Sequence, residues 1–441
     1  MTTLQSAAVQ RSEREYSLAD AAHRALTAIG ELGLNTRLEY YGGNPTVWRC
    51  QLLDRQQQPV PSGLGYGKGD IQTARVGAIY EALEVLLAQE FRPDTLQLRS
   101  CADVAMSPLA GEAYADLLAM QPEQRIACRI YSQINGDNEL AVPLFLSNIG
   151  WAEDTASPLR AQIGDTTDYE SLARYSSNRG SAIGGSFAEA AVHSLNEAIE
   201  RDAISLFLIQ TFLAAQPTAP AFLDPQTLPH DLRELLGLVQ ERLSRQVWLI
   251  DITSDLDVPA TLAYASAPGG GSRRGYGASL SRHYSVYQAL TELLQVELTH
   301  ESEADRLRAI ELLAEYPTLQ ACAACELPAP SRPAETSAFV PYIDTDAPSS
   351  PSEHLSRVVD KLAWHGYSAY LHEVHTSSNG VTTVHTQVPD LENFYMIAGG
   401  SAVVPGRRGI RAMQQPAWPR REQQINDLSI GTSSICSDGN A

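Results

Sequence analysis

Three segments of this 441-residue chain place carboxylates at spacings that could build a metal and phosphate site. In residues 186–208, a helix with about 100° per residue would hold Glu189, Glu197 and Glu200 within roughly 80° of one another, with Arg201 beside them. Apolar residues fall on the opposite side of this helix. A polar stripe opposite an apolar stripe is also typical of an ordinary surface helix, so this segment alone leaves both interpretations open.

Two further segments repeat the pattern: a glycine-rich stretch, expected to be a turn, leads into a helix that offers oxygen ligands three residues apart. The pairs are Glu81 with Glu84 and Glu292 with Gln295. Clustered carboxylates repel one another, so a cation must separate them if the fold brings them together. Oxygen ligands suit Mg²⁺, which in turn binds phosphate oxygens. The pattern therefore points to a nucleotide, with Lys68 and Arg201 facing its phosphates.

In their order along the chain, these segments resemble the YcaO family of ATP-dependent enzymes that modify peptide backbones. Three family patterns fit: a GKG turn followed by ExxE, an upstream glutamate followed by ExxER, and ALTExxQ. They match residues 67–69 with Glu81 and Glu84, Glu189 with Glu197, Glu200 and Arg201, and residues 289–295. The text LIDIT at 249–253 and VPDLENFY…VVPGRRG at 388–409 is also similar, so the resemblance covers roughly residues 45–412.

The resemblance implies the α+β class and a YcaO-like mixed α/β fold, in which several helices packed on β-sheet form a site for ATP and Mg²⁺. The implied Mg²⁺ ligands are Glu81, Glu84, Glu189, Glu197 and Glu200, and the implied nucleotide contacts are Lys68, Arg201, Glu292, Gln295 and Arg282. Such enzymes activate a backbone amide by O-phosphorylation while a Cys, Ser or Thr side chain adds to it and closes an azoline. No covalent enzyme nucleophile is required, so no catalytic residue is assigned.

The chain also departs from the family pattern. Val85 and Gln288 stand where many relatives have arginine, and Gly185 aligns with an asparagine. The C-terminus ends SICSDGNA and lacks the PxPxP tail common among azoline-forming members. Two alternatives therefore stay open beside azoline formation. One is thioamide formation with a TfuA-type partner, and the other is a non-catalytic scaffold that keeps the fold.

Composition and charge indicate which binding partners and which cellular compartment to expect. The formal net charge of −20 disfavours non-specific binding to nucleic acid or to an anionic membrane. The sequence shows neither an apolar run of membrane-spanning length nor the apolar core of a signal peptide, which predicts a cytoplasmic protein. The resemblance implies a ribosomally synthesised precursor peptide as substrate and a separate leader-binding partner of the E1-like (ThiF) or TfuA type. It also implies a flavin dehydrogenase for azole products, and a homodimer stays open.

The expected organisation has three parts: a helical segment at 1–45 that could dock a partner, the YcaO domain at 46–412 with a loop insertion at 323–351, and a flexible tail at 413–441. Within these parts, periodicity and turn residues predict individual elements. Helices are expected at 17–33, 73–89, 108–119 and 352–365, and strands at 36–53, 247–253, 261–265 and 368–374.

Two smaller features could carry chemistry. His193 lies on the carboxylate face of its helix, where a proton carrier and an inert surface histidine are both open interpretations. Cys322 and Cys325 form a CxxC that could be half a zinc site or a redox pair. No second pair of Cys or His at metal spacing accompanies them, so ordinary reduced thiols are expected.

Overall fold

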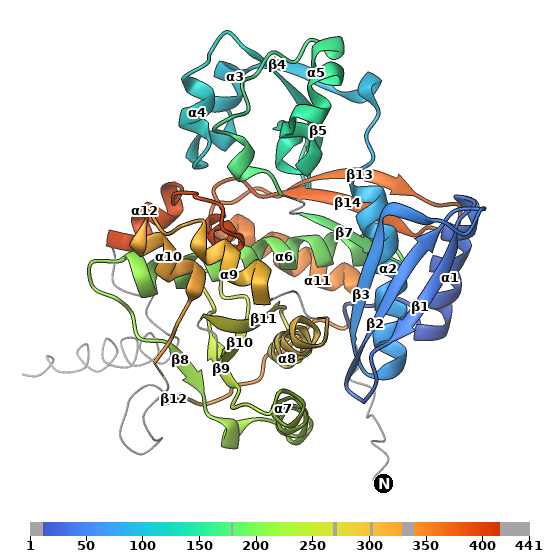
Figure 1. Ribbon diagram of the computed structural model, residues 1–441, viewed down its shortest axis with the longest axis vertical. Coiled ribbons are helices and arrows are strands. Elements are labelled where there is room, and N and C mark those ends of the chain that lie inside the picture. The colour runs from blue at the N-terminus through green and yellow to red at the C-terminus, as the bar shows by residue number, and fades with distance from the viewer. Residues whose placement is uncertain (1–11, 178–179, 268–270, 300–302, 329–338, 415–441) are drawn as a thin grey trace, which may run out of the picture.

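The computed structural model describes residues 12–177, 180–267, 271–299, 303–328 and 339–414. Three β-sheets and the helices between them make a mixed α/β architecture, as the sequence predicts. Figure 1 shows the long helix α6 (Phe187–Leu208) running through the centre of the molecule, with a sheet-and-helix layer at its right, another below and a smaller unit above. The predicted tail at 413–441 lies almost entirely outside the described residues.

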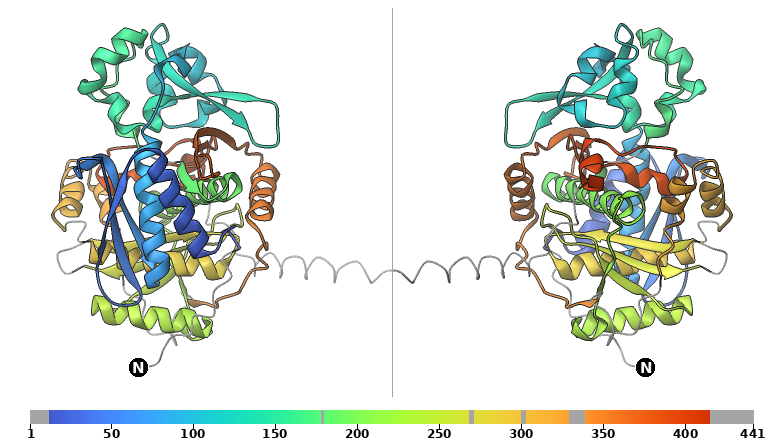
Figure 2. Two further views of the ribbon diagram at one scale, coloured as in Figure 1. Left: turned by 90° about the vertical axis from the view of Figure 1, so that its right-hand side faces the viewer. Right: turned by 90° about the vertical axis from the view of Figure 1, so that its left-hand side faces the viewer.

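The N-terminal layer confirms the elements expected there. Helix α1 (Leu18–Glu31) begins at Ser17, whose Oγ accepts a hydrogen bond of 3.2 Å from the Asp20 amide. Strands β1 (Asn35–Tyr40), β2 (Thr46–Leu53) and β3 (Pro59–Gly69) form an antiparallel sheet in the order β1-β2-β3. Helix α2 (Ile71–Ala88) packs on this sheet, as the left view of Figure 2 shows.

The prediction of glycine-rich turns was wrong, because both stretches are strands. Gly65 and Gly67 lie in β3, and Gly275 lies in β11 (Ser272–Ala278), which packs on helix α8 (Arg282–Leu298). A Cβ added to Gly67 would come within 1.8 Å of the Ala74 carbonyl oxygen in α2. A Cβ on Gly275 would come within 2.2 Å of the Leu293 amide nitrogen in α8. Glycine is needed because the backbone of a helix lies directly on each strand.

Replacing Gly67 with alanine should therefore destabilise the protein by about 3 kcal/mol or more, because the neighbouring atoms are backbone and cannot rotate away. Gly237 is the matched control, since a Cβ there meets nothing within 4 Å on the exposed side of helix α7 (His230–Leu243). Its replacement by alanine should stabilise the protein by about 0.5–1 kcal/mol. Denaturant unfolding of both variants measures the difference, and equal stabilities would contradict the close strand–helix contact.

The second layer carries the sheet order β11-β10-β9-β8-β12. Its strands are β8 (Ala221–Leu223), β9 (Trp248–Asp251), β10 (Ala260–Ser266), β11 and β12 (Phe339–Val340), and helices α7 (His230–Leu243) and α8 pack beside each other. The strands expected at 247–253 and 261–265 correspond to β9 and β10. Strand β12 runs parallel to β8 and falls inside the stretch predicted as a loop insertion. That insertion therefore contributes an edge strand to the core sheet.

The third sheet carries helix α6. Its strands follow the order β4-β5-β13-β14-β7, with β6 paired to β5: β4 (Gln97–Ser100), β5 (Arg125–Gln133), β6 (Glu139–Pro143), β7 (Ser181–Gly184), β13 (Tyr370–Thr376) and β14 (Thr382–Gln387). The predicted helix at 352–365 is α11 (Pro351–Trp364), although its cap is Ser350. Ser186 caps α6 by accepting a 3.3 Å hydrogen bond from the Glu189 amide, which fixes where the carboxylate face begins.

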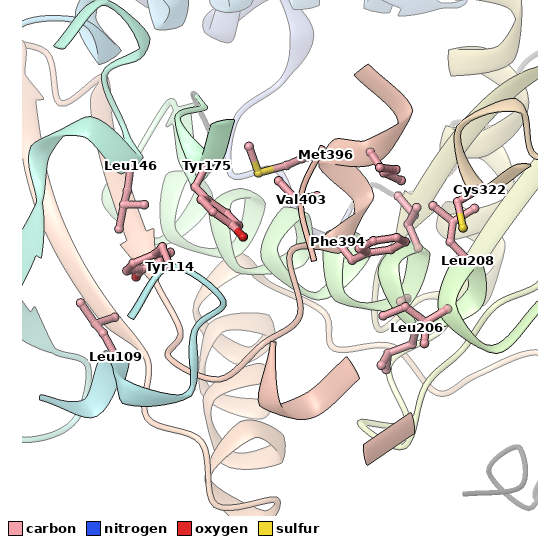
Figure 3. Close-up of a cluster of buried hydrophobic side chains, with 14 of the residues drawn as sticks. Leu109, Tyr114, Leu146, Tyr175, Leu206, Leu208, Cys322, Phe394, Met396 and Val403 are labelled. Atoms are coloured by element: carbon pink, nitrogen blue, oxygen red, sulfur yellow. The ribbon is translucent and has the colours of Figure 1, made fainter. Parts of the chain in front are cut away.

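The small upper unit was largely unexpected from the sequence. It holds β4–β6 and the short helices α3 (Cys101–Ala105), α4 (Ala115–Ala119) and α5 (Ser157–Ile163). The helix predicted at 108–119 is interrupted after a 3₁₀ turn at Pro108–Gly111. Figure 3 shows how the unit joins the rest: Tyr114 and Leu146 share one buried cluster with Leu206 of α6 and Phe394.

The remaining described helices, α9 (Glu303–Glu311), α10 (Pro317–Ala324) and α12 (Arg407–Gln414), lie near one another at the left of Figure 1. Cys322 and Cys325 are free thiols buried at the end of α10, and burial raises the pKa of Cys322 to about 12. A thiol held protonated in this way is a poor nucleophile and a poor metal ligand. Among the described helices, none has the length and apolar character needed to cross a lipid bilayer.

Candidate functional site

A cavity of about 1060 Å³ opens among α2, α6, α7, α8 and β3, and the three predicted segments meet on its walls. The predicted site residues that line it are Lys68, Glu81, Glu84, Glu189, Glu197, Glu200, Arg201, Glu292 and Gln295. The acidic faces of α2, α6 and α8 all turn toward the same space. The packing of these helices against β3 thus brings together side chains up to 227 positions apart in the sequence, from Lys68 to Gln295.

Arg282 is the predicted contact that the structure does not bring into this cavity. It lies at the first turn of α8 and donates from Nη1 to Oδ2 of Asp251 over 2.9 Å. Asp251 in turn accepts hydrogen bonds from the amide and hydroxyl of Thr253, and Arg282 lowers the pKa of its carboxyl. The guanidinium therefore ties α8 to β9 and serves the fold beneath the site.

Lys68 and Arg201 each form an ion pair in the walls of the cavity. Lys68 Nζ donates to Glu292 Oε2 over 2.5 Å, which joins β3 to α8. Arg201 Nη2 lies 3.2 Å from Glu197 Oε1, one helical turn away on α6. The Arg201 guanidinium also stacks 4.7 Å from the ring centre of Tyr395, which fixes its plane. Both cations are partly exposed to the cavity, so they can exchange these partners for a bound anion.

The carboxylates of α2 and α6 lie on the same cavity, where Glu189 is buried and Glu84, Glu197 and Glu200 are half-buried. Glu84 accepts hydrogen bonds of 3.1 Å from the Ser181 hydroxyl and the Ile183 amide, yet burial and its neighbours Glu197 and Glu81 still raise its pKa well above the ordinary value. Burial and Glu292 raise the pKa of Glu200 to about 8, against the opposing effect of Arg201. Raised pKa values at adjacent glutamates mark a concentration of negative charge that lacks enough counter-charge.

Sequence reasoning missed the residues that precede α1. We call residues 12–16 the N-terminal strap, because each side chain binds a different part of the fold. Arg14 Nη1 donates to Glu189 Oε1 over 2.8 Å inside the cavity. The Glu13 carboxylate is buried and accepts a hydrogen bond from Asn196 Nδ2 over 3.1 Å and another from the Ser279 hydroxyl. No periodicity marks this segment, so no sequence pattern could have assigned Arg14 to the site.

The strap also explains one departure from the family pattern. A Cβ added at Gly185 would lie 2.7 Å from the ring of Tyr16 and 3.3 Å from Glu189 Oε2. The Tyr16 ring therefore occupies the space that an asparagine side chain at position 185 would take. The other two departures, Val85 and Gln288, both line the cavity. The altered positions thus surround the site and leave its carboxylates in place.

The donor set fits Mg²⁺, although its side chains are turned to protein partners. Within the described ranges, no three His, Cys, Asp or Glu side chains are gathered around one point as a metal site. Six glutamates of α2, α6 and α8 nevertheless face only three cations, Arg14, Lys68 and Arg201. Buried carboxylate oxygens in excess over cations are the ligands that a hard divalent ion requires.

A second buried charge cluster lies on the other side of α6. Asp202 is fully buried, and its Oδ1 accepts a 2.6 Å hydrogen bond from Arg408 Nε of α12. Arg408 also donates to both carboxylate oxygens of Asp255 and to the Tyr367 hydroxyl, 2.8 Å away. Consecutive residues of α6 therefore have different roles: Arg201 lines the cavity, and Asp202 binds Arg408 of α12.

Solved structures of three other proteins share this fold. A heterocyclase in complex with substrate and cofactor has a TM-score of 0.60 at 17% identity, covering 86% of this chain and 52% of that chain. YcaO from Methanopyrus kandleri, bound with AMPPCP and Mg²⁺, has 0.59 at 18% identity, covering 89% and 95%. The E. coli microcin synthetase McbBCD complex has 0.52 at 13% identity, covering 81% and 88%. This chain thus spans about half the length of the heterocyclase chain.

Among curated proteins, no sequence matches that of this chain. A family model described as YcaO cyclodehydratase, ATP- and Mg²⁺-binding, matches residues 65–392, which is well over half of the 441 residues. Its description confirms ATP and Mg²⁺ as the expected pair of cofactors, and the matched range contains α2, α6, α7, α8 and the end of β3 that carries Lys68. The chain therefore belongs to the YcaO cyclodehydratase family.

Proposed function

We propose that this protein uses ATP and Mg²⁺ to activate backbone amides of a ribosomally synthesised peptide, and that Cys, Ser or Thr side chains of that peptide then close to azolines. One observation carries the proposal: α2, α6, α8 and β3 place the predicted carboxylates and cations on the walls of one cavity of about 1060 Å³. That volume lies at the upper end of the range for small-molecule pockets, about 300–1,000 Å³. It leaves room for a peptide segment beside a nucleotide.

Each group of residues has a separate task in this proposal. Glu81, Glu84, Glu189, Glu197 and Glu200 hold Mg²⁺, while Lys68, Arg14 and Arg201 face the phosphates and Glu292 and Gln295 complete the opposite wall. When bound, Mg·ATP supplies the phosphoryl group that turns an amide oxygen into a leaving group. The protein contributes mainly position and charge, since phosphoryl transfer needs little covalent chemistry from the enzyme.

The proposal also includes partner proteins. The E. coli microcin synthetase is a complex of several proteins, and the match to this chain covers only 52% of the heterocyclase chain. We propose that a separate leader-binding protein of the E1-like or TfuA type delivers the precursor peptide, and that a flavin dehydrogenase can act on azoline products. In this proposal residues 46–412 form the catalytic domain. Residues 1–45 and 413–441 flank it, and residues 1–45 could dock the partner.

Intact mass spectrometry of the peptide encoded beside the gene tests this function. After incubation with the protein, its neighbouring partner and MgATP, we expect the loss of one water per modified residue and one ADP released per ring. A gain of sulfur for oxygen in the presence of sulfide would replace azoline with thioamide formation. An unchanged peptide with no ADP would mean that the chain is a scaffold.

A further inference from the structure

One nitrogen base lines the cavity and is not used by the metal and phosphate contacts. His193 lies on α6, one turn after Glu189 and one turn before Glu197. Its imidazole is partly exposed to the cavity and interacts with the Ile183 backbone, while its Nδ1 is buried. It is the sole histidine among the described residues that line this space.

The surroundings of His193 keep the imidazole neutral in the resting protein. Burial, followed by the charges of Arg14 on the strap and Lys68 on β3, lowers its pKa to about 3. A neutral imidazole can accept a proton, which the ammonium and guanidinium groups of the cavity cannot do. Because a bound triphosphate would neutralise Arg14 and Lys68, the same imidazole would become more basic once the nucleotide is in place.

We propose that His193 accepts the proton of the peptide side chain that closes the ring, which makes it a catalytic residue of this enzyme. The proposal rests on the proposed function. In the step, the S–H or O–H bond of the substrate side chain breaks and its proton moves to the imidazole. A bond forms from that sulfur or oxygen to the preceding amide carbon, and the carbonyl π electrons move onto the amide oxygen. That oxygen then carries the negative charge, and it is the atom that would receive the phosphoryl group.

The glutamates of α2 and α6 and the phenol of Tyr80 are less suited to this task. The glutamates of α2 and α6 are the implied metal ligands, and a carboxylate bound to a cation is a weak proton acceptor. Burial raises the pKa of Tyr80 further above its ordinary value, so its phenol stays protonated. His193 is positioned between Glu189 and Glu197 along one helix face, so a peptide lying over the metal site would contact it.

The test compares His193→Asn with wild type on two precursor peptides that differ only in Cys or Ser at the modified position. We expect ring formation on the Ser peptide to fall more than about 100-fold at pH 7. On the Cys peptide, raising the pH from 7 to 9 should restore at least about tenfold, because a thiol with a pKa of about 8.5 ionises by itself. Binding of Mg·AMPPCP, followed by calorimetry, should change less than about threefold.

His372→Asn is the matched control, because His372 lies on β13 outside the cavity and its Nδ1 is 3.0 Å from the Ile130 carbonyl. It should keep wild-type ring formation on both peptides. Equal losses on Cys and Ser at both pH values, or a loss of nucleotide binding, would show that His193 is structural. Unchanged rates for His193→Asn would overturn the proposal while the function stands. Absence of any modification by wild type would overturn the function itself, and the proposal with it.

Discussion

Replacement of Glu200 by glutamine should abolish ATP turnover, with a loss of more than about 100-fold. Glu200 lies among Glu197, Glu292, Arg201 and Lys68, where its pKa is raised to about 8 because burial and neighbouring carboxylates disfavour its charge. The charge is therefore costly in the metal-free protein and useful only when a cation is bound. Glutamine keeps the shape of the side chain and removes the anionic ligand.

The same variant should keep or raise the melting temperature of the metal-free protein at neutral pH, because the wild-type carboxyl must take up a proton when the protein folds and glutamine does not. Wild type should gain melting temperature on addition of Mg·AMPPCP, and the variant should gain much less. Glu241→Gln on the exposed side of α7 is the control and should behave as wild type in both measurements. Wild-type ADP release by Glu200→Gln would reject the role of this carboxylate.

Replacement of Arg408 by methionine should destabilise the protein by about 3–5 kcal/mol, the cost of leaving buried charges without their partner. Arg408 is 7% exposed and joins fully buried Asp202 of α6 to Asp255. Methionine fills a similar volume but leaves two carboxylates facing each other. Urea unfolding measures the change in the free energy of unfolding.

Two further variants make this measurement specific. Arg411 lies on the exposed side of the same helix α12. Its replacement by methionine should therefore change the free energy of unfolding by less than about 0.5 kcal/mol. The double variant Arg408→Met with Asp202→Asn should recover part of the loss, since it removes one unpaired charge. A loss below about 1 kcal/mol for Arg408→Met alone would show that the cluster contributes little net stability.

Local signals predicted the helices of the site well. Helical periodicity alone placed Glu189, Glu197 and Glu200 on one face of α6, and all three line the cavity. The same reasoning paired Glu81 with Glu84 on α2, and both line the cavity. Such features depend on residues a few positions apart, so one sequence contains the information.

Features set by distant parts of the chain could not be predicted. Gly67 was expected in a turn because glycine marks turns. It instead pairs with β2 as part of a strand, and glycine is required there because α2 lies directly across it. Arg282 is near the third motif in sequence, but its pairing with Asp251 takes it away from the cavity. Arg14 enters the site through an irregular segment whose path depends on Glu189, 175 positions later.

The long separations within the cavity also determine when the site can exist during synthesis. Lys68 and Glu292, which form one of its ion pairs, are 224 positions apart. At translation rates of about 5–20 residues per second, Glu292 leaves the ribosome tunnel roughly 11–45 s after Lys68. A growing chain that already displays its first cation and its first carboxylate pair therefore still lacks α8. Nucleotide binding therefore requires synthesis to have passed α8, and chains truncated before α8 should neither bind nor hydrolyse ATP.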